Sequence, residues 1–87
     1  MGKMAKIHKR DEDVYEIIAS KIKKKRIESN ITQAELAERS NYSHEFIRRI
    51  EAPNGKKYFS INTLVKLARA LGVQPEEFMK GINNEEE

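Results

Sequence analysis

Cysteine is absent from this sequence of 87 residues, so it offers no disulfide framework, no thiolate metal site and no thiol nucleophile. A chain without cysteine is compatible with a reducing, cytoplasmic compartment. No apolar run approaches the ~20 residues that a membrane span needs, and the N-terminus lacks the apolar stretch of a signal peptide. We therefore expect a soluble cytoplasmic protein with one domain and one modest hydrophobic core.

Histidine is scarce, and neither His8 nor His44 has a carboxylate cluster at metal-ligand spacing around it. Ser43 precedes His44 directly, but a helix cap explains this serine better than a nucleophile–base pair does. A chain this short also has no core large enough to enclose a substrate pocket. We expect no metal, no cofactor, no small-molecule ligand and no enzymatic activity.

The net charge of +3 is unevenly distributed along the chain. Residues 1–26 carry nine Lys and Arg against four Asp and Glu, whereas residues 60–87 carry three against five. A basic front end suits a polyanion-binding face, although a solvated lysine-rich helix is the simpler interpretation of charge alone. The basic residues of the first ten positions are compatible with a minor-groove arm or with a mobile segment that contacts nothing.

Helix signals divide the chain into an N-terminal arm, a helical domain and a short tail. Asp13 and Glu16 suit the start of a helix with the apolar spacing of Ile18 and Ile22, and Asn30 suits its end. The predicted boundaries are 1–13 for a flexible basic arm, 14–82 for the domain and 83–87 for a frayed acidic tail.

Two short helices follow, each with a recognisable cap. Thr32 and Glu35 form a capping box at the start of the second helix, and Asn41 suits a tight turn after it. Ser43 then caps a third helix, which we predict from His44 to Glu51.

The last third of the chain predicts two further helices. Ser60 caps a fourth helix that Gly72 ends, and Pro75 opens a short fifth helix. The apolar residues of that fifth helix either complete the core or form a dimer seam: Phe78, Met79 and Ile82. With no convincing strand in the sequence, the fold class is all-α, with five short helices.

The third helix has two chemically different faces. At 100° per residue, Phe46, Ile47, Ile50 and Glu51 share one arc. The opposite arc carries groups that can pair with base edges, namely His44, Glu45, Arg48 and Arg49. In isolation this arc is an ordinary solvated surface, but two capped helices joined by a short turn match the helix-turn-helix plan.

Three separated motifs resemble the phage-repressor and Cro-like (XRE-type) helix-turn-helix family. They are Ile31-Thr32-Gln33-Ala34-Glu35-Leu36-Ala37, Phe46-Ile47-Arg48-Arg49-Ile50-Glu51 and Leu64-Val65-Lys66-Leu67-Ala68-Arg69-Ala70-Leu71-Gly72-Val73. The resemblance covers roughly residues 17–80, with the motifs at compatible spacing. The resemblance implies a compact, lambda-repressor-like domain that binds operator DNA as a homodimer and acts on transcription, usually as a repressor.

The resemblance also implies roles for individual residues. Base reading falls to His44, Glu45, Arg48 and Arg49. The resemblance matches Gln33 to a contact with a DNA phosphate, and the sequence around it adds further candidates for such contacts: Thr32, Tyr42, Ser43, Lys25, Lys56 and Lys57. Arg26 and Glu51 match a buried ion pair that links the first helix to the end of the third, and the dimer seam is expected at Phe78, Met79 and Ile82.

Some positions of the sequence depart from the family pattern, and several functions other than that of a phage-type repressor fit the sequence. Tyr42 replaces a smaller apolar residue, so it either packs over the core or reaches the sugar–phosphate edge. The loop after Glu51 is about two residues longer than usual, which bears on Lys56 and Lys57. A restriction-modification controller, an autoregulating antitoxin and a protein-binding module without DNA binding are the alternatives to a phage-type repressor.

Overall fold

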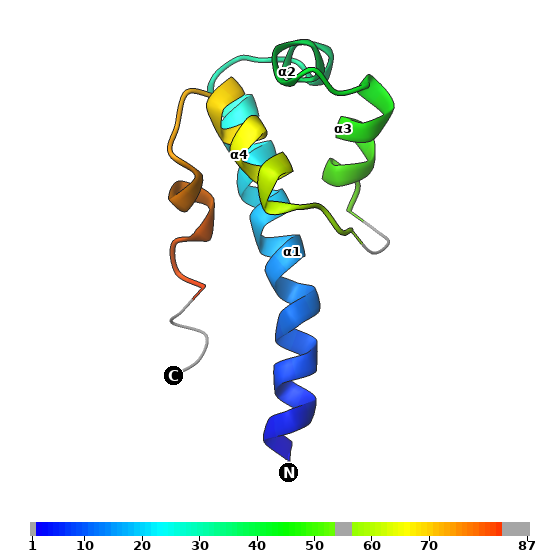
Figure 1. Ribbon diagram of the computed structural model, residues 1–87, viewed down its shortest axis with the longest axis vertical. Coiled ribbons are helices and arrows are strands. Elements are labelled where there is room, and N and C mark those ends of the chain that lie inside the picture. Colours follow the sequence, from blue (N-terminus) through cyan, green and yellow to red (C-terminus); the bar gives the residue numbers. More distant parts are fainter. Residues whose placement is uncertain (1, 54–56, 83–87) are drawn as a thin grey trace.

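The structure is a computed structural model (Figure 1). Its longest element is helix α1, Gly2–Glu28. The structure describes residues 2–53 and 57–82, with side chains in α1 from Val14 onward. The helix therefore begins well before the predicted start at Asp13. Neither Gly nor Pro interrupts residues 3–28, and an established helix extends at little cost. Whether residues 1–13 are mobile stays a prediction, and the predicted tail, 83–87, lies outside the described residues.

Helix α2, Gln33–Ser40, has the predicted capping box. The Thr32 hydroxyl accepts from the Glu35 amide at 3.0 Å, and the Glu35 carboxylate accepts from the Thr32 amide at 2.8 Å. Between α1 and α2 the chain turns at Asn30, whose φ of 59° is in the left-handed region. The prediction of this junction is confirmed.

Helix α3, His44–Glu51, has the predicted boundaries. Asn41 takes a φ of 65°, which turns the chain sharply out of α2. The Ser43 hydroxyl then accepts from the Phe46 amide at 3.0 Å and caps α3. Two local signals, a residue that tolerates positive φ and a helix cap, therefore form the turn between the two helices.

Helix α4, Ile61–Ala70, is capped by Ser60 as predicted, and Gly72 follows it with a φ of 74°. The predicted fifth helix is wrong in type and length. A single 3₁₀ turn, η1, covers Pro75–Met79, and the backbone of Lys80 is already extended. Gly81 follows with a φ of 88°, so only one turn forms between Pro75 and this reversal. The described chain is thus all-α, with four α-helices and one 3₁₀ turn.

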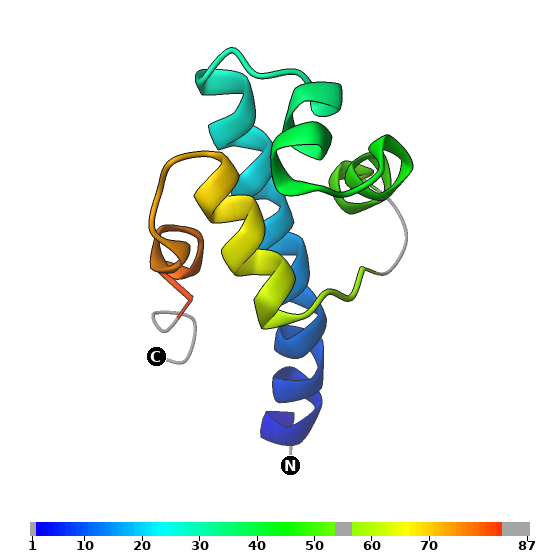
Figure 2. The ribbon, with the colours of Figure 1, turned by 45° about the horizontal axis from the view of Figure 1, so that its top comes forward.

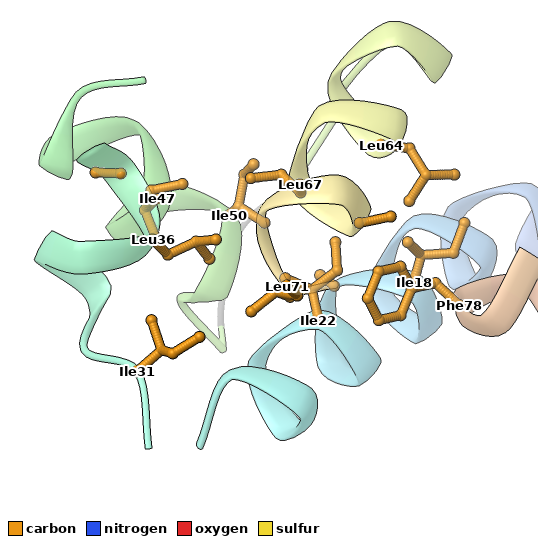
Figure 3. Packing of buried hydrophobic residues seen from close by; sticks show 13 residues of the cluster. Ile18, Ile22, Ile31, Leu36, Ile47, Ile50, Leu64, Leu67, Leu71 and Phe78 are labelled. Atoms are coloured by element: carbon orange, nitrogen blue, oxygen red, sulfur yellow. The ribbon is translucent and has the colours of Figure 1, made fainter. Parts of the chain in front are cut away.

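The core lies where the four α-helices and η1 meet. Helix α4 packs between α2 and η1, and α3 bridges α2 and α1. The largest fully buried side chains come one from each helix, and Figure 3 shows them converging: Ile22, Leu36, Ile47 and Leu67. Phe78 is also buried, at 3% exposure, so this ring belongs to the core and is not free to form a dimer seam.

The N-terminal half of α1 extends beyond every other described element in both ribbon views (Figures 1 and 2). The dimensions of the molecule, 45 × 24 × 21 Å, reflect this projection. At the other end of the long axis lie α2 and the junction between α1 and α2. The molecule therefore has a packed end and a projecting end.

Within residues 2–53 and 57–82, no helix has the length and apolar character of a membrane span. In the same part of the chain, no three His, Cys, Asp or Glu side chains come together as a set that could hold a metal ion.

Candidate nucleic-acid interface

Helix α3 buries one face and exposes the other. Ile47, Ile50 and Glu51 are buried, and Phe46 is half-buried against the core. All four residues of the opposite arc are exposed: His44, Glu45, Arg48 and Arg49. Burial thus follows the predicted division of the helix, because the apolar positions repeat at helical spacing.

The exposed face carries charges of both signs. The Arg48 guanidinium lies 3.6 Å from the Glu45 carboxylate, one helical turn away, and both side chains are more than half exposed. This pairing supplies a partner for the one acidic group on the face, whose negative charge opposes the approach of a polyanion. Two arginines, Arg48 and Arg49, against one glutamate give this face a net positive charge. The imidazole of His44 lies on the same face.

The buried face is anchored by an ion pair between α1 and α3. Arg26 donates to both carboxylate oxygens of Glu51, at 2.7 and 2.9 Å, and to the carbonyl of Ile31 at 2.7 Å. The side chains are 11% and 1% exposed. A bidentate pair with further hydrogen bonds satisfies groups that would otherwise be costly to bury. One guanidinium thus fixes the end of α3 to α1 and to the short segment between α1 and α2.

Gln33 extends this network to the exposed face. Its amide nitrogen donates to Glu51 at 3.0 Å, and its oxygen lies 3.4 Å from Nε2 of His44. The resemblance assigns Gln33 a phosphate contact, and the structure shows it half-buried between α2 and α3. Its side chain therefore connects the buried carboxylate of Glu51 to the first residue of α3.

Tyr42 packs on the domain and does not extend freely into solvent. Its ring stacks on Phe46, with centroids 4.6 Å apart, and its hydroxyl donates to Thr63 at 2.9 Å. The ammonium of Lys66 lies 5.4 Å from the centre of the same ring. The sequence did not point to Lys66, because only the packing of α4 brings this cation over the ring of Tyr42, in the turn before α3.

Of the other residues assigned to phosphates, Thr32 and Ser43 are exposed and cap their helices, whereas Lys25 is half-buried near the end of α1. Lys56 lies outside the described residues.

Lys57 departs from its predicted role. Its side chain is 3% exposed, with the ammonium 3.1 Å from Glu16 and donating also to the carbonyl of Ala52. The loop after α3 folds back on α1, where Tyr15 packs edge-on against both Tyr58 and Phe59 with centroid distances of 5.2 Å. Buried in this way, Lys57 holds the loop and is not available to a phosphate.

The model of the family described as helix-turn-helix matches residues 22–78 of the chain. The matched segment contains the last part of α1, the whole of α2, α3 and α4, and most of η1. It also contains the exposed arc of α3 and the ion pair beneath it. No curated protein and no solved structure matches the chain.

Proposed function

The chain belongs to the Cro-like helix-turn-helix family of DNA-binding proteins, and from this premise we propose that it is a sequence-specific transcriptional repressor. It acts as a homodimer on a pseudo-palindromic operator, in the cytoplasm where that DNA lies. The family is typically non-enzymatic, and the proposal includes no catalytic step. The single observation that carries the proposal is the exposed, doubly basic arc of α3 above a fully anchored inner face.

The chemistry of the arc suits the edges of base pairs in the major groove. A guanidinium such as that of Arg48 or Arg49 can donate two hydrogen bonds to guanine, and the imidazole of His44 can donate or accept one. Glu45 can accept from cytosine or keep its pairing with Arg48. These side chains read the sequence in our proposal, with α3 lying in the groove.

The position of α2 suits contacts with the DNA backbone. Its capped N-terminus, beginning at Gln33, presents amides next to the start of α3. Thr32 and Ser43 are exposed residues at the two helix starts. Contacts of this kind orient a protein on the duplex without reading its sequence.

The rigidity of α3 supports specific reading. A helix that selects bases has to hold its angle in the groove, and the Arg26–Glu51 pair fixes one end of α3 while the Ser43 cap fixes the other. Two copies would place their α3 helices about 34 Å apart, one turn of the duplex, on a single face of the DNA.

Selection from a pool of randomised duplexes tests the proposal. The full chain should enrich one motif with two inverted half-sites. Arg49→Ala should weaken binding by ~1–3 kcal/mol per half-site and relax the preference at one base pair. The matched control is Arg69→Ala, since Arg69 is an exposed arginine on α4 outside the arc. A pool that stays random after selection would contradict the proposal.

A further inference from the structure

The buried carboxylate of Glu51 fixes which way the amide group of Gln33 points. Gln33 lies half-buried between α2 and α3, and its amide nitrogen donates to Oε1 of Glu51 at 3.0 Å. The side chain of Glu51 is 1% exposed and also accepts both hydrogen bonds of the pair with Arg26. A carboxylate that pairs with a guanidinium can only accept, so the NH₂ group of Gln33 has to face Glu51. The carbonyl oxygen of Gln33 is therefore left to face the start of α3.

This carbonyl oxygen selects one form of the His44 ring. It lies 3.4 Å from Nε2 of His44. A carbonyl oxygen has no proton to donate, so the contact is a hydrogen bond only when Nε2 carries the proton. A neutral imidazole has a proton on one nitrogen alone, which makes Nδ1 the acceptor. The chain of contacts that begins at Arg26 thus sets the proton of an exposed ring on α3.

Nδ1 is the ring nitrogen that remains for a contact with DNA. His44 is the first residue of α3, and it is exposed on the arc that reads bases in our proposal. A neutral ring presents an acceptor at Nδ1, which suits the exocyclic amino group of cytosine or adenine. A protonated ring presents a donor at the same atom, which suits O6 or N7 of guanine. The two protonation states of His44 therefore favour different bases.

The charged side chains around His44 have partners other than its ring. They come from α1, α3 and α4: Arg26 with Glu51, Glu45 with Arg48, and Lys66 over the ring of Tyr42. Among these residue types, histidine is the one whose charge changes between about pH 5 and pH 8. The contact with Gln33 needs the Nε2 proton in both forms of the ring. A change of pH within this range therefore alters Nδ1 and leaves the rest of the network as it is.

From these observations we propose that His44 determines specificity at one base pair of the half-site, with a preference that depends on pH. Above about pH 7 it selects a base with an exocyclic amino group, cytosine or adenine, and at about pH 5.5 it selects guanine. Gln33 is a positioning residue, since it acts through His44. The inference rests on the proposed function, because it assigns one base pair of the operator to one atom of the arc.

Selection from randomised duplexes at about pH 5.5 and about pH 8 tests the proposal with the full chain, because histidine changes its charge between these values. One base pair of each half-site should change from cytosine or adenine to guanine as the pH is lowered. On duplexes that differ only at this base pair, the ratio of the two dissociation constants should change by at least about fivefold. The other positions of the motif should stay the same.

The two histidines of the chain supply a matched pair of variants. His44→Gln replaces the ring with an amide that does not titrate, so its selected motif should be the same at both pH values. His8→Gln is the control, because His8 is the only other histidine in the sequence, and this variant should keep the wild-type change. A change that persists in His44→Gln, or that disappears in His8→Gln, would overturn the inference.

Gln33→Ala tests the positioning role. Without the carbonyl oxygen of Gln33, Nε2 of His44 is free to donate or to accept, so the preference at this one base pair should fall below about twofold at pH 8. A variant that binds every duplex more weakly but keeps the preference would contradict this role. Imidazole nitrogen chemical shifts of the free chain at about pH 8 test it without DNA. The wild type should carry the proton on Nε2, and a proton on Nδ1 would overturn the inference.

The selections also separate this inference from the proposed function. An enriched motif that is identical at both pH values would reject the inference and leave the proposed function standing. A pool that stays random at both pH values would reject the proposed function, and with it the base preference assigned to His44. Circular dichroism at both pH values checks that the chain and its variants keep the same helical content.

Discussion

The α2–α3 end of the molecule and the projecting end of α1 differ in how firmly contacts within the monomer hold them. At the α2–α3 end a buried carboxylate, Glu51, receives hydrogen bonds from Arg26 and Gln33 within 3.0 Å, and both helices are capped. At the projecting end, an apolar groove, lined by residues that include Ile61 and Met79, stays open beside a helix whose charges occur in a basic block followed by an acidic block. An element that reads a sequence needs its orientation fixed within the monomer, and the α2–α3 end has that property through its two helix caps and the ion pair to α1.

The largest effect should come from removing the buried carboxylate. Glu51→Ala leaves the guanidinium of Arg26 and the amide of Gln33 without their acceptor, so we expect a loss of ~3–5 kcal/mol in the free energy of unfolding. Urea denaturation measures it. Glu45→Ala is the control and should change stability by less than about 0.5 kcal/mol, because Glu45 is 65% exposed. Equal losses in the two variants would mean that the ion pair is not what anchors α3.

Phe78→Ala tests whether this ring belongs to the core or to the dimer. Its burial at 3% exposure predicts a loss of about 3 kcal/mol in the free energy of unfolding, measured at a protein concentration low enough to keep the chain monomeric. Met79→Ala, at a half-exposed neighbour, should leave the monomer nearly as stable and weaken the dimer instead. The reverse pattern would restore Phe78 to the dimer seam.

Ser43→Ala tests the cap that begins α3. The hydroxyl accepts from the Phe46 amide, so its removal should cost about 1 kcal/mol. Ser20→Ala removes an exposed hydroxyl from α1 and should change stability by only about 0.5 kcal/mol or less. Thermal unfolding of the two variants gives the difference, and indistinguishable midpoints would show that the cap contributes nothing to the stability of α3.

The smallest expected effect is that of Lys57→Met on the salt dependence of DNA binding. Because the Lys57 ammonium is engaged by Glu16, its loss should leave the salt dependence of DNA binding unchanged. If Lys25 meets a phosphate, Lys25→Met should lower the slope of log K against log salt by about 0.9. Anisotropy titrations over a range of salt concentrations measure both slopes. A lower slope for Lys57→Met would return this lysine to the DNA interface.

Local chemistry explains which parts of the fold could be predicted from the sequence. Thr32, Ser43 and Ser60 cap their helices through amides three residues away, and Asn41 turns the chain by its own φ. Such signals depend on neighbours in the sequence, so the boundaries of α2 and α3 followed from them. The separation of α3 into a buried and an exposed face followed from helical spacing in the same way.

The errors concern contacts between distant residues and the length of elements that no strong signal ends. Lys57 and Glu16 are 41 residues apart, and nothing near either residue indicates their pairing. At η1, the apolar spacing of Phe78, Met79 and Ile82 suggested a helix, but the positive φ of Gly81 ends it after one turn. At α1, Asp13 looked like a cap, whereas a helix without Gly or Pro continues through it.

The most direct test is a titration of the isotopically labelled full chain with the selected duplex, monitored by amide chemical shifts. It shows whether the α2–α3 end is the surface that contacts DNA. We predict that the largest shifts occur in α3, from His44 to Arg49, and at the start of α2 near Gln33. Residues of the groove, such as Ile61 and Met79, should shift little, because they belong to α4 and η1 and lie outside α2 and α3. Shifts centred on the groove or on the N-terminal half of α1, with α3 unchanged, would contradict the account.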